Sequence, residues 1–290
     1  MPPREPRIPG RIPGRRLMSP ESVALLGFVT AAAGSVGGIG GAVLLVPALV
    51  LGGLAPSEAA PLGLLAVAAG SLSAAASQID EGLVNHRLGV TLELPTSAAA
   101  AIGALLLGVV PERALRVILG LLAMVAAAAM VRTRGAGVAT APAGFAAETS
   151  GEWPGVLGGT IRERGTVLAY EARRLPTGLT LSSLAGLVAG LSGFGGGFIK
   201  TPTMVAVMGV PVKVAAATGL FMVGITAAAG LAVHLARGAL DTHLGAAVVL
   251  GALGGGAAGA WVQRRAGTRV ATIVLAVLLT FAGVALVGRA

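Results

Sequence analysis

One lysine of this chain lies inside a long apolar run, directly after a cluster of glycines. The stretch Gly190–Pro202 reads Gly-Leu-Ser-Gly-Phe-Gly-Gly-Gly-Phe-Ile-Lys-Thr-Pro, and its lysine is Lys200. Glycine and proline interrupt a helix here, because glycine costs backbone entropy and proline lacks an N–H. The interruption exposes backbone N–H groups that favour a negative ligand, and Lys200 adds a positive charge and further donors. The stretch therefore predicts a site for a small anion.

A second glycine-rich interruption occurs earlier in the chain, at Gly34–Pro47. Shifting the first half by 155 residues aligns Gly38 with Gly193, Gly40 with Gly195, Gly41 with Gly196, and Pro47 with Pro202. We predict that these glycines, together with Gly197, contact the substrate, and that the two prolines are hinges or helix breaks. Lys200 has Leu45 as its counterpart, so only the second interruption carries a charge. Chance similarity between two halves rich in alanine and glycine is the alternative.

Polar side chains in neighbouring apolar runs could complete such a site. Thr218 and Thr226 are predicted hydroxyl donors to the anion, and Glu93 is the candidate carrier of a coupled proton. Each has an ordinary alternative, since hydroxyls often bond the carbonyl one turn back and Glu93 could lie at a water interface. Glycines also allow close helix packing in membranes, and Lys200 could extend towards the membrane surface.

The composition places these residues in a membrane protein. Of 290 residues, 55% are hydrophobic and only 11% are charged, whereas soluble proteins carry roughly 25% charged residues. The chain has no cysteine and three scattered histidines, so the sequence predicts neither thiol chemistry nor a metal or other cofactor. The net charge of +9 comes mostly from arginine, which we attribute to helix ends and anionic lipid rather than to nucleic-acid binding.

The apolar runs predict an all-α integral membrane fold with about eight transmembrane helices in two internal repeats, each starting with a glycine-broken or re-entrant helix. The expected spans are 23–54, 59–79, 88–110 and 114–131, followed by 179–209, 212–236, 240–263 and 270–287. Four full spans in each half would make the repeats parallel, whereas a re-entrant first segment would make them inverted.

Four segments follow from this pattern. We expect a disordered basic tail at 1–21, the first repeat at 22–131, a hydrophilic linker at 132–177 and the second repeat at 178–290. Within the linker, 156–175 mixes apolar and charged residues and is predicted as an amphipathic surface helix or as solvated chain. A signal peptide is the alternative at the start of the chain. Arginines favour the cytoplasmic side for the tail and linker.

The two halves resemble the sulfite exporter TauE/SafE family of membrane transporters. The resemblance rests on Gly195–Pro202, Gly209–Thr218 and Gly224–Gly230, with a weaker first copy at Gly38–Gly41 and Pro47. It implies helices arranged in two repeats and the movement of small sulfur-containing or organic anions, such as sulfite or sulfonates.

The sequence therefore predicts a secondary permease for a small anion in the cell inner membrane. A more specific version of this prediction couples the transport of the anion to protons. The anion would be a sulfur-containing oxyanion, an organosulfonate or an organic acid. A passive anion channel and a membrane-embedded assembly protein are the alternatives. No enzyme is predicted, because no paired carboxylates, cysteine or histidine cluster form a catalytic motif. The expected partners are the anion and membrane lipid, and a homodimer is an open alternative to a monomer.

Overall fold

The apolar runs form long helices, as their length and composition predict. The computed structural model describes residues 18–37, 41–80, 82–132, 151–152, 157–163, 166–265 and 268–290. The first half contains α1 (Pro20–Gly37), α2 (Ala42–Leu51), α3 (Pro56–Asp80), α4 (His86–Leu107) and α5 (Glu112–Arg132). The second half contains α6 (Leu175–Ser192), α7 (Gly197–Pro202), a π-helical turn (Thr203–Val207), α8 (Val212–Ala236), α9 (Thr242–Arg265) and α10 (Thr268–Gly288). Most of the predicted tail lies outside the described residues, and α1 already begins at Pro20.

Glycines separate α1 from α2 and α6 from α7, at the two predicted positions. Gly193, Gly195 and Gly196 have φ angles of 78°, 76° and 73°, in the left-handed region that L side chains rarely adopt. Gly38 and Gly40 lie outside the described residues.

The two prolines behave differently. Pro202 is the last residue of α7, and the π-helical turn follows it directly. Proline lacks the N–H that would continue the α-helical bonding, so a change of helix type at this point is expected. In contrast, α2 continues through Pro47 to Leu51. The prediction of a helix break at Pro47 is therefore wrong, because one missing N–H leaves the other bonds of this helix in place.

Helices α1 and α2 form a helical hairpin that returns to the side from which it started. Gly41, just before α2, packs so closely on Thr30 and Ala31 of α1 that a Cβ atom would overlap their backbone. Gly52, just after α2, lies against the side chain of Met18, just before α1. Both ends of this hairpin therefore lie together.

Helices α6 and α7 form a second hairpin of the same kind. Gly196, just before α7, packs against the backbone of Ala185 in α6. The backbone N–H of Arg173, before α6, donates to the carbonyl of Met208, after the π-helical turn, at 2.9 Å. This hairpin also starts and ends at one place.

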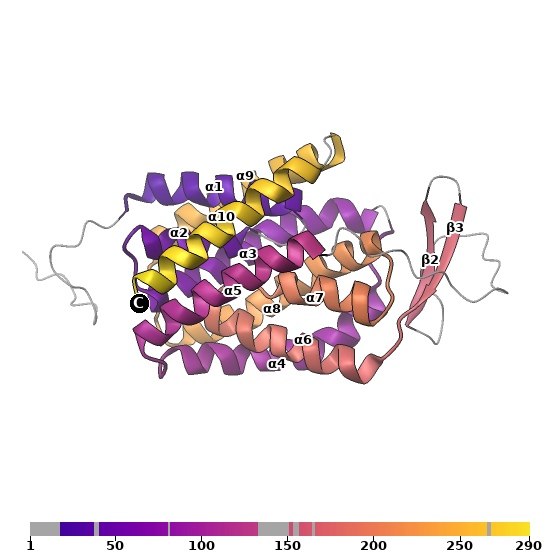
Figure 1. The fold of residues 1–290 in the computed structure, drawn as a ribbon, viewed down its shortest axis with the longest axis horizontal. Helices are drawn as coiled ribbons and strands as arrows, with labels where there is room; N and C mark the ends of the chain where they lie inside the picture. The colour runs from indigo at the N-terminus through magenta and orange to yellow at the C-terminus, as the bar shows by residue number, and fades with distance from the viewer. Residues whose placement is uncertain are drawn as a thin grey trace, which may run out of the picture.

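The helix termini gather at two ends of the bundle, which lie left and right in Figure 1. At the left end, called the tail end, hydrogen bonds join Ser57 to Glu112, Arg237 to Leu105, and Arg289 to Leu51. At the right end, called the sheet end, hydrogen bonds join Asn85 to Thr218 and Asn85 to Tyr170. The α1–α2 hairpin therefore enters from the tail end, and the α6–α7 hairpin enters from the sheet end.

Two helix pairs pack closely and in parallel through glycines. On α9, Gly251, Gly255 and Gly259 face the backbone of Ala24, Phe28 and Ala32 in α1. Between α4 and α6, Gly186 faces Thr96, Gly190 faces Ala100, and Gly103 faces Leu187. Small residues let helix backbones approach in a membrane, where packing rather than hydrophobic burial drives association.

The linker contains β-strands where an amphipathic helix was one of two predictions. Strands β1 (Gly151–Glu152), β2 (Gly158–Glu163) and β3 (Thr166–Glu171) form an antiparallel sheet in the order β1-β2-β3. The helix prediction is wrong because β-branched and aromatic residues favour a pleated strand, and because two of them are buried against the bundle. Ile161 and Tyr170 pack with Leu88 and Met204 in one apolar cluster.

The outer faces of the helices are apolar, as expected for a multi-pass membrane protein. Among the described residues, α4, α6, α8 and residues 242–259 of α9 are long and apolar enough to cross a membrane, and α2 and 273–288 are shorter apolar helices. Large apolar side chains such as Leu94, Leu250 and Phe281 are exposed by 79%, 73% and 71%. Lipid would cover these side chains.

Candidate functional site

Lys200 lies in the interior of the helix bundle, in the last turn of α7. Its side chain is completely buried. The alternative that it extends to the membrane surface is therefore wrong for this conformation. A charged side chain at membrane depth is costly and requires a partner.

Glu93 of α4 is that partner. Its Oε2 lies 3.0 Å from the Lys200 Nζ, and Glu93 is only 3% exposed. Glu93 therefore does not lie at a water interface. The structure brings together the predicted cation of the site and the predicted proton carrier.

Thr226 of α8 links the two charged groups. Its Oγ1 accepts a hydrogen bond from the Lys200 Nζ and lies within hydrogen-bond distance of the Glu93 Oε1. The same hydroxyl lies 3.0 Å from the carbonyl of Met222, one turn back. A hydroxyl has a single proton to donate, so Thr226 donates either to Glu93 or to Met222.

Ser97 supplies a further donor to the carboxylate. Its Oγ donates to the Glu93 Oε1 at 2.7 Å, from one turn further along α4. The Glu93 carboxylate is thus surrounded by three polar groups, which are the ammonium group of Lys200 and the hydroxyls of Thr226 and Ser97. Three elements, α4, α7 and α8, supply these groups.

A buried hydroxyl of α6 has no such partner. The Ser182 Oγ is buried and makes no hydrogen bond within the described part of the chain. Gly186, one turn after Ser182, contacts Thr96 of α4, and the two helices run in parallel. This register brings Ser182 to the level of Glu93. Buried hydroxyls are rarely left unpaired, so a donor is available there.

The pair of charges is neutral as a whole. Lys200 and Glu93 carry opposite single charges, and each compensates the cost of burying the other. Removing either group alone would leave an isolated charge inside the bundle. Any ligand that separates the pair must therefore restore the balance of charge.

Thr218 does not join this cluster. It lies eight residues before Thr226 on α8, about 12 Å along the helix axis. Its Oγ1 accepts the backbone N–H of Asn85 at 2.9 Å, and the Asn85 side chain caps α4 and bonds the Tyr170 hydroxyl at 3.0 Å. Thr218 thus belongs to a contact between α4, α8 and β3 at the sheet end, and a role in anion binding stays a prediction.

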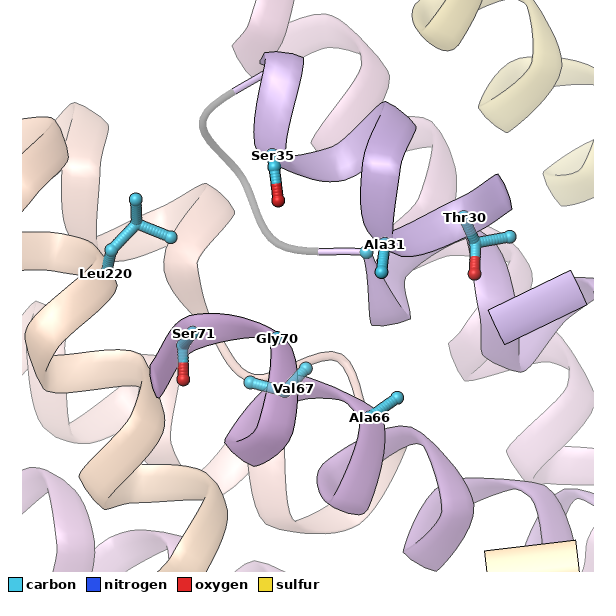
Figure 2. A pocket seen from close by; sticks show the side chains of 9 residues that line it. Thr30, Ala31, Ser35, Ala66, Val67, Gly70, Ser71 and Leu220 are labelled. Atoms are coloured by element: carbon cyan, nitrogen blue, oxygen red, sulfur yellow. The ribbon is translucent and has the colours of Figure 1, made fainter. Parts of the chain in front are cut away.

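A small cavity lies beside the first break (Figure 2). It is lined by Thr30, Ala31, Ser35, Gly41, Ala66, Val67, Gly70, Ser71 and Leu220. Its volume is about 10 Å³, which is space for about one water molecule. Ser71 is the counterpart of Thr226 at the 155-residue offset, so the first half keeps a hydroxyl where the second half has the ion pair.

The predicted glycines lie against protein atoms in this conformation. Gly193 faces the backbone of Ala60, Gly195 faces Val67 and Val223, and Gly196 faces Ala185. Gly197 is buried as the first residue of α7, which has six residues and therefore only a small dipole. Packing accounts for these glycines, and direct contact with a substrate stays a prediction.

Sequence reasoning missed Ser97, Ser182 and the contact through Asn85. Ser97 could have been found, because it lies one helical turn from Glu93 on the same face. Ser182 and Asn85 become meaningful only once the packing of α6 and α8 on α4 is known.

Comparison with known proteins identifies the family of this chain. The pattern of the family described as sulfite exporter TauE/SafE matches residues 23–286. The chain belongs to the TauE/SafE family. A relative described as probable membrane transporter protein YunE of Bacillus subtilis (strain 168) is 23% identical over 274 residues, covering 91% of this chain and 96% of that protein. No solved structure matches. As a member of the TauE/SafE family, the protein is a multi-pass membrane transporter.

Proposed function

We propose that the protein is a secondary permease of the cytoplasmic membrane that carries a small anion, and that the anion binds at Lys200. The observation that carries this proposal is the buried Lys200–Glu93 pair, with its Nζ to Oε2 distance of 3.0 Å. The Glu93 carboxylate is itself an oxyanion held by an ammonium group and two hydroxyls. These donors would suit a carboxylate, sulfonate or sulfur oxyanion in the same place.

The unpartnered Ser182 hydroxyl supports a ligand larger than the Glu93 carboxylate. A tetrahedral or pyramidal oxyanion has oxygens pointing in more directions than a carboxylate and can accept from an additional donor. The family description names sulfite, which is an anion of this kind. We therefore favour a small sulfur oxyanion or organosulfonate over larger organic acids.

We further propose that the two halves are inverted repeats, each made of a re-entrant hairpin and three spanning helices. In this relation α1 corresponds to α6, α2 to α7, α3 to α8, α4 to α9 and α5 to α10. If each helix is replaced by its counterpart, each main helix contact becomes a contact that is also observed. Packing of α1 on α9 corresponds to α6 on α4, α3 on α9 to α8 on α4, and α2 on α10 to α7 on α5. The pairs α3–α8 and α5–α10 correspond to themselves. This exchange supports a two-fold relation between halves.

The turn glycines support the same relation. Gly82 and Gly238 have φ angles of 65° and 63°, and Gly53 and Gly209 have φ angles of 107° and 75°. Members of each pair lie 156 residues apart. Gly82 lies at the sheet end and Gly238 at the tail end, as inverted repeats require. Such repeats commonly alternate the access of a central site between the two sides of a membrane.

The first experiment replaces the ion pair as a unit. A single Lys200→Ala change would leave Glu93 buried without a partner, at a cost of about 3–5 kcal/mol, and could prevent folding. The double variant Lys200→Met with Glu93→Leu removes both charges and is expected to keep thermal stability equal or higher. We expect this variant to insert normally but to lose transport.

The measurement is uptake and counterflow of radiolabelled sulfite and methanesulfonate in proteoliposomes. Counterflow separates a permease from a passive channel, since a channel shows none. Glu112→Gln serves as the control, because Glu112 is exposed and its contact with Arg116 is 3.7 Å on the surface. Wild-type transport by the stably folded double variant would refute anion binding at Lys200.

A further inference from the structure

We infer that each anion enters this site together with one proton, which Glu93 takes up, so that the substrate is a monoanion and transport is electroneutral. This inference rests on the function proposed above. It concerns the charge of the substrate and the coupled ion, which anion transport by itself leaves open.

The charge balance of the site carries the inference. Lys200 and Glu93 are 0% and 3% exposed, and their charges cancel. A monoanion that takes the place of Glu93 beside Lys200 would leave the site with one net negative charge. Protonation of Glu93 restores neutrality, because the site then holds one ammonium, one bound anion and one neutral carboxylic acid.

Other ionisable groups on the surrounding helices lie too far along them to compensate. Helix α6 has no ionisable side chain. On α4, His86 and Arg87 precede Glu93 by seven and six residues, and on α8 Lys213 and His234 lie near the helix ends. The nearby α3 and α5 carry Glu58, Glu112, Arg113 and Arg116 close to the tail end, and Asp80 and Arg132 are the last residues of these two helices, at their opposite ends. Within the described residues, Glu93 is therefore the carboxylate that can accept the proton.

Thr226 permits this exchange without losing its hydrogen bonds. In the observed state its hydroxyl proton points to Glu93 or to the Met222 carbonyl, which lies 3.0 Å away. When Glu93 is protonated, the hydroxyl can donate to Met222 and still accept from Lys200. The proton is conserved in this step: it moves from water to a Glu93 oxygen and later returns to water on the other side of the membrane.

A single carboxylate also limits the charge of the substrate. A dianion with one proton would leave one net negative charge buried beside Lys200. The site should therefore select a monoanion over a dianion of similar size and shape.

The test uses purified full-length protein in proteoliposomes that contain a pH-sensitive dye. The monoanions are methanesulfonate and isethionate, and the dianions are sulfate and thiosulfate. Both sulfonates are anions of strong acids, so any proton that accompanies them must travel on the protein. Potassium with valinomycin sets the membrane potential independently of the anion gradient.

We expect inward gradients of the sulfonates to acidify the lumen, with one proton per anion and no dependence on membrane potential. Sulfonate flux without acidification, or preferential flux of the dianions, would overturn the inference while leaving the proposed anion transport intact. No flux of any of these anions above that of empty liposomes would instead overturn the proposed function, and the inference with it.

Glu93→Gln provides a second and independent arm. Glutamine resembles the protonated acid, so anion binding measured by isothermal titration should become independent of pH, and acidification should disappear. Glu112→Gln makes the same chemical change at an exposed carboxylate and should leave both properties unchanged. Acidification that persists in Glu93→Gln at wild-type stoichiometry would refute the role of Glu93. If that variant does not fold, the wild-type proton stoichiometry alone decides.

Discussion

A single hydroxyl, that of Thr226, contacts both charged residues of the candidate site. It accepts from Lys200 and can donate to Glu93 or to its own helix. Hydroxyls of this kind usually satisfy only the carbonyl one turn back. Here the neighbouring charges give the same hydroxyl a second orientation, so a small rotation could accompany protonation of Glu93.

Ser182 allows a prediction at the scale of one residue. If its unpaired hydroxyl serves the bound anion, Ser182→Ala should raise the KM for the anion about tenfold, which corresponds to about 1.4 kcal/mol. Thermal stability should stay equal or increase, because the change removes a buried polar group without a partner. The measurements are transport kinetics in proteoliposomes and thermal unfolding in detergent.

Ser183→Ala is the matched control for this prediction. Ser183 lies beside Ser182 but donates to the carbonyl of Leu179 at 2.8 Å, so its hydroxyl is already satisfied within the helix. We expect its KM to equal that of the wild type. Equal KM values for both variants would show that Ser182 does not contact the anion.

At the scale of elements, α4 and α8 are joined at two levels. Asn85 and Thr218 contact each other at the sheet end, and Glu93 and Thr226 contact each other eight residues further along both helices. This spacing corresponds to about 12 Å. The β2–β3 hairpin reaches the outer contact through Tyr170. Separation of the inner pair by movement of α4 would therefore strain the outer contact as well.

Tyr170→Phe tests the contact between the sheet and α4. It removes the hydroxyl that bonds the Asn85 side chain at 3.0 Å, and we expect a loss of about 1 kcal/mol in stability. The KM for the anion should not change, which is the opposite pattern to Ser182→Ala. Thr91→Val is the control, because the exposed Thr91 hydroxyl donates only to the Arg87 carbonyl of its own helix. A raised KM in Tyr170→Phe would instead indicate that the sheet contacts the substrate.

At the scale of the whole molecule, two helical hairpins enter the bundle from opposite ends. The α1–α2 hairpin starts beside Met18 at the tail end, and the α6–α7 hairpin starts beside Arg173 at the sheet end. In the proposed arrangement, each repeat adds three long helices to its hairpin. Three is an odd number, so the second repeat begins on the opposite side of the membrane from the first. This arithmetic distinguishes inverted repeats from the parallel repeats that four full spans would give.

Cysteine labelling can test the inverted arrangement, because the native chain has no cysteine. Gly82→Cys and Gly238→Cys place single thiols at corresponding turns, where a Cβ atom would have nothing within 4 Å. Both glycines have positive φ, so any strain should be similar in the two variants. A membrane-impermeant maleimide added to intact cells should label one of them and not the other. Labelling of both from the same side would indicate parallel repeats.

The sequence predicted the long helices and the two glycine-rich breaks, but not the continuation of α2 through Pro47, because length, apolarity and glycine clusters are local signals. It also identified Lys200, Glu93 and Thr226 separately. Their contact could not be predicted, since Glu93 and Lys200 are 107 residues apart and meet only through the packing of α4 and α7 on α8. The sheet was missed for the same kind of reason. The β-branched and aromatic residues favour a strand locally, but the burial of Ile161 and Tyr170 against the bundle decides that conformation, and this burial depends on packing that no local pattern reports.

The difference between Leu45 and Lys200 has a consequence for the resting state of the transporter. If two inverted repeats had identical sequences, the state open to one side of the membrane and the state open to the other would be related by the two-fold axis and would have equal free energy. A charge in only one hairpin removes that equality. We therefore expect the empty transporter to favour the state that is open to one side of the membrane. The free-energy barrier to substrate entry should then differ between the two sides.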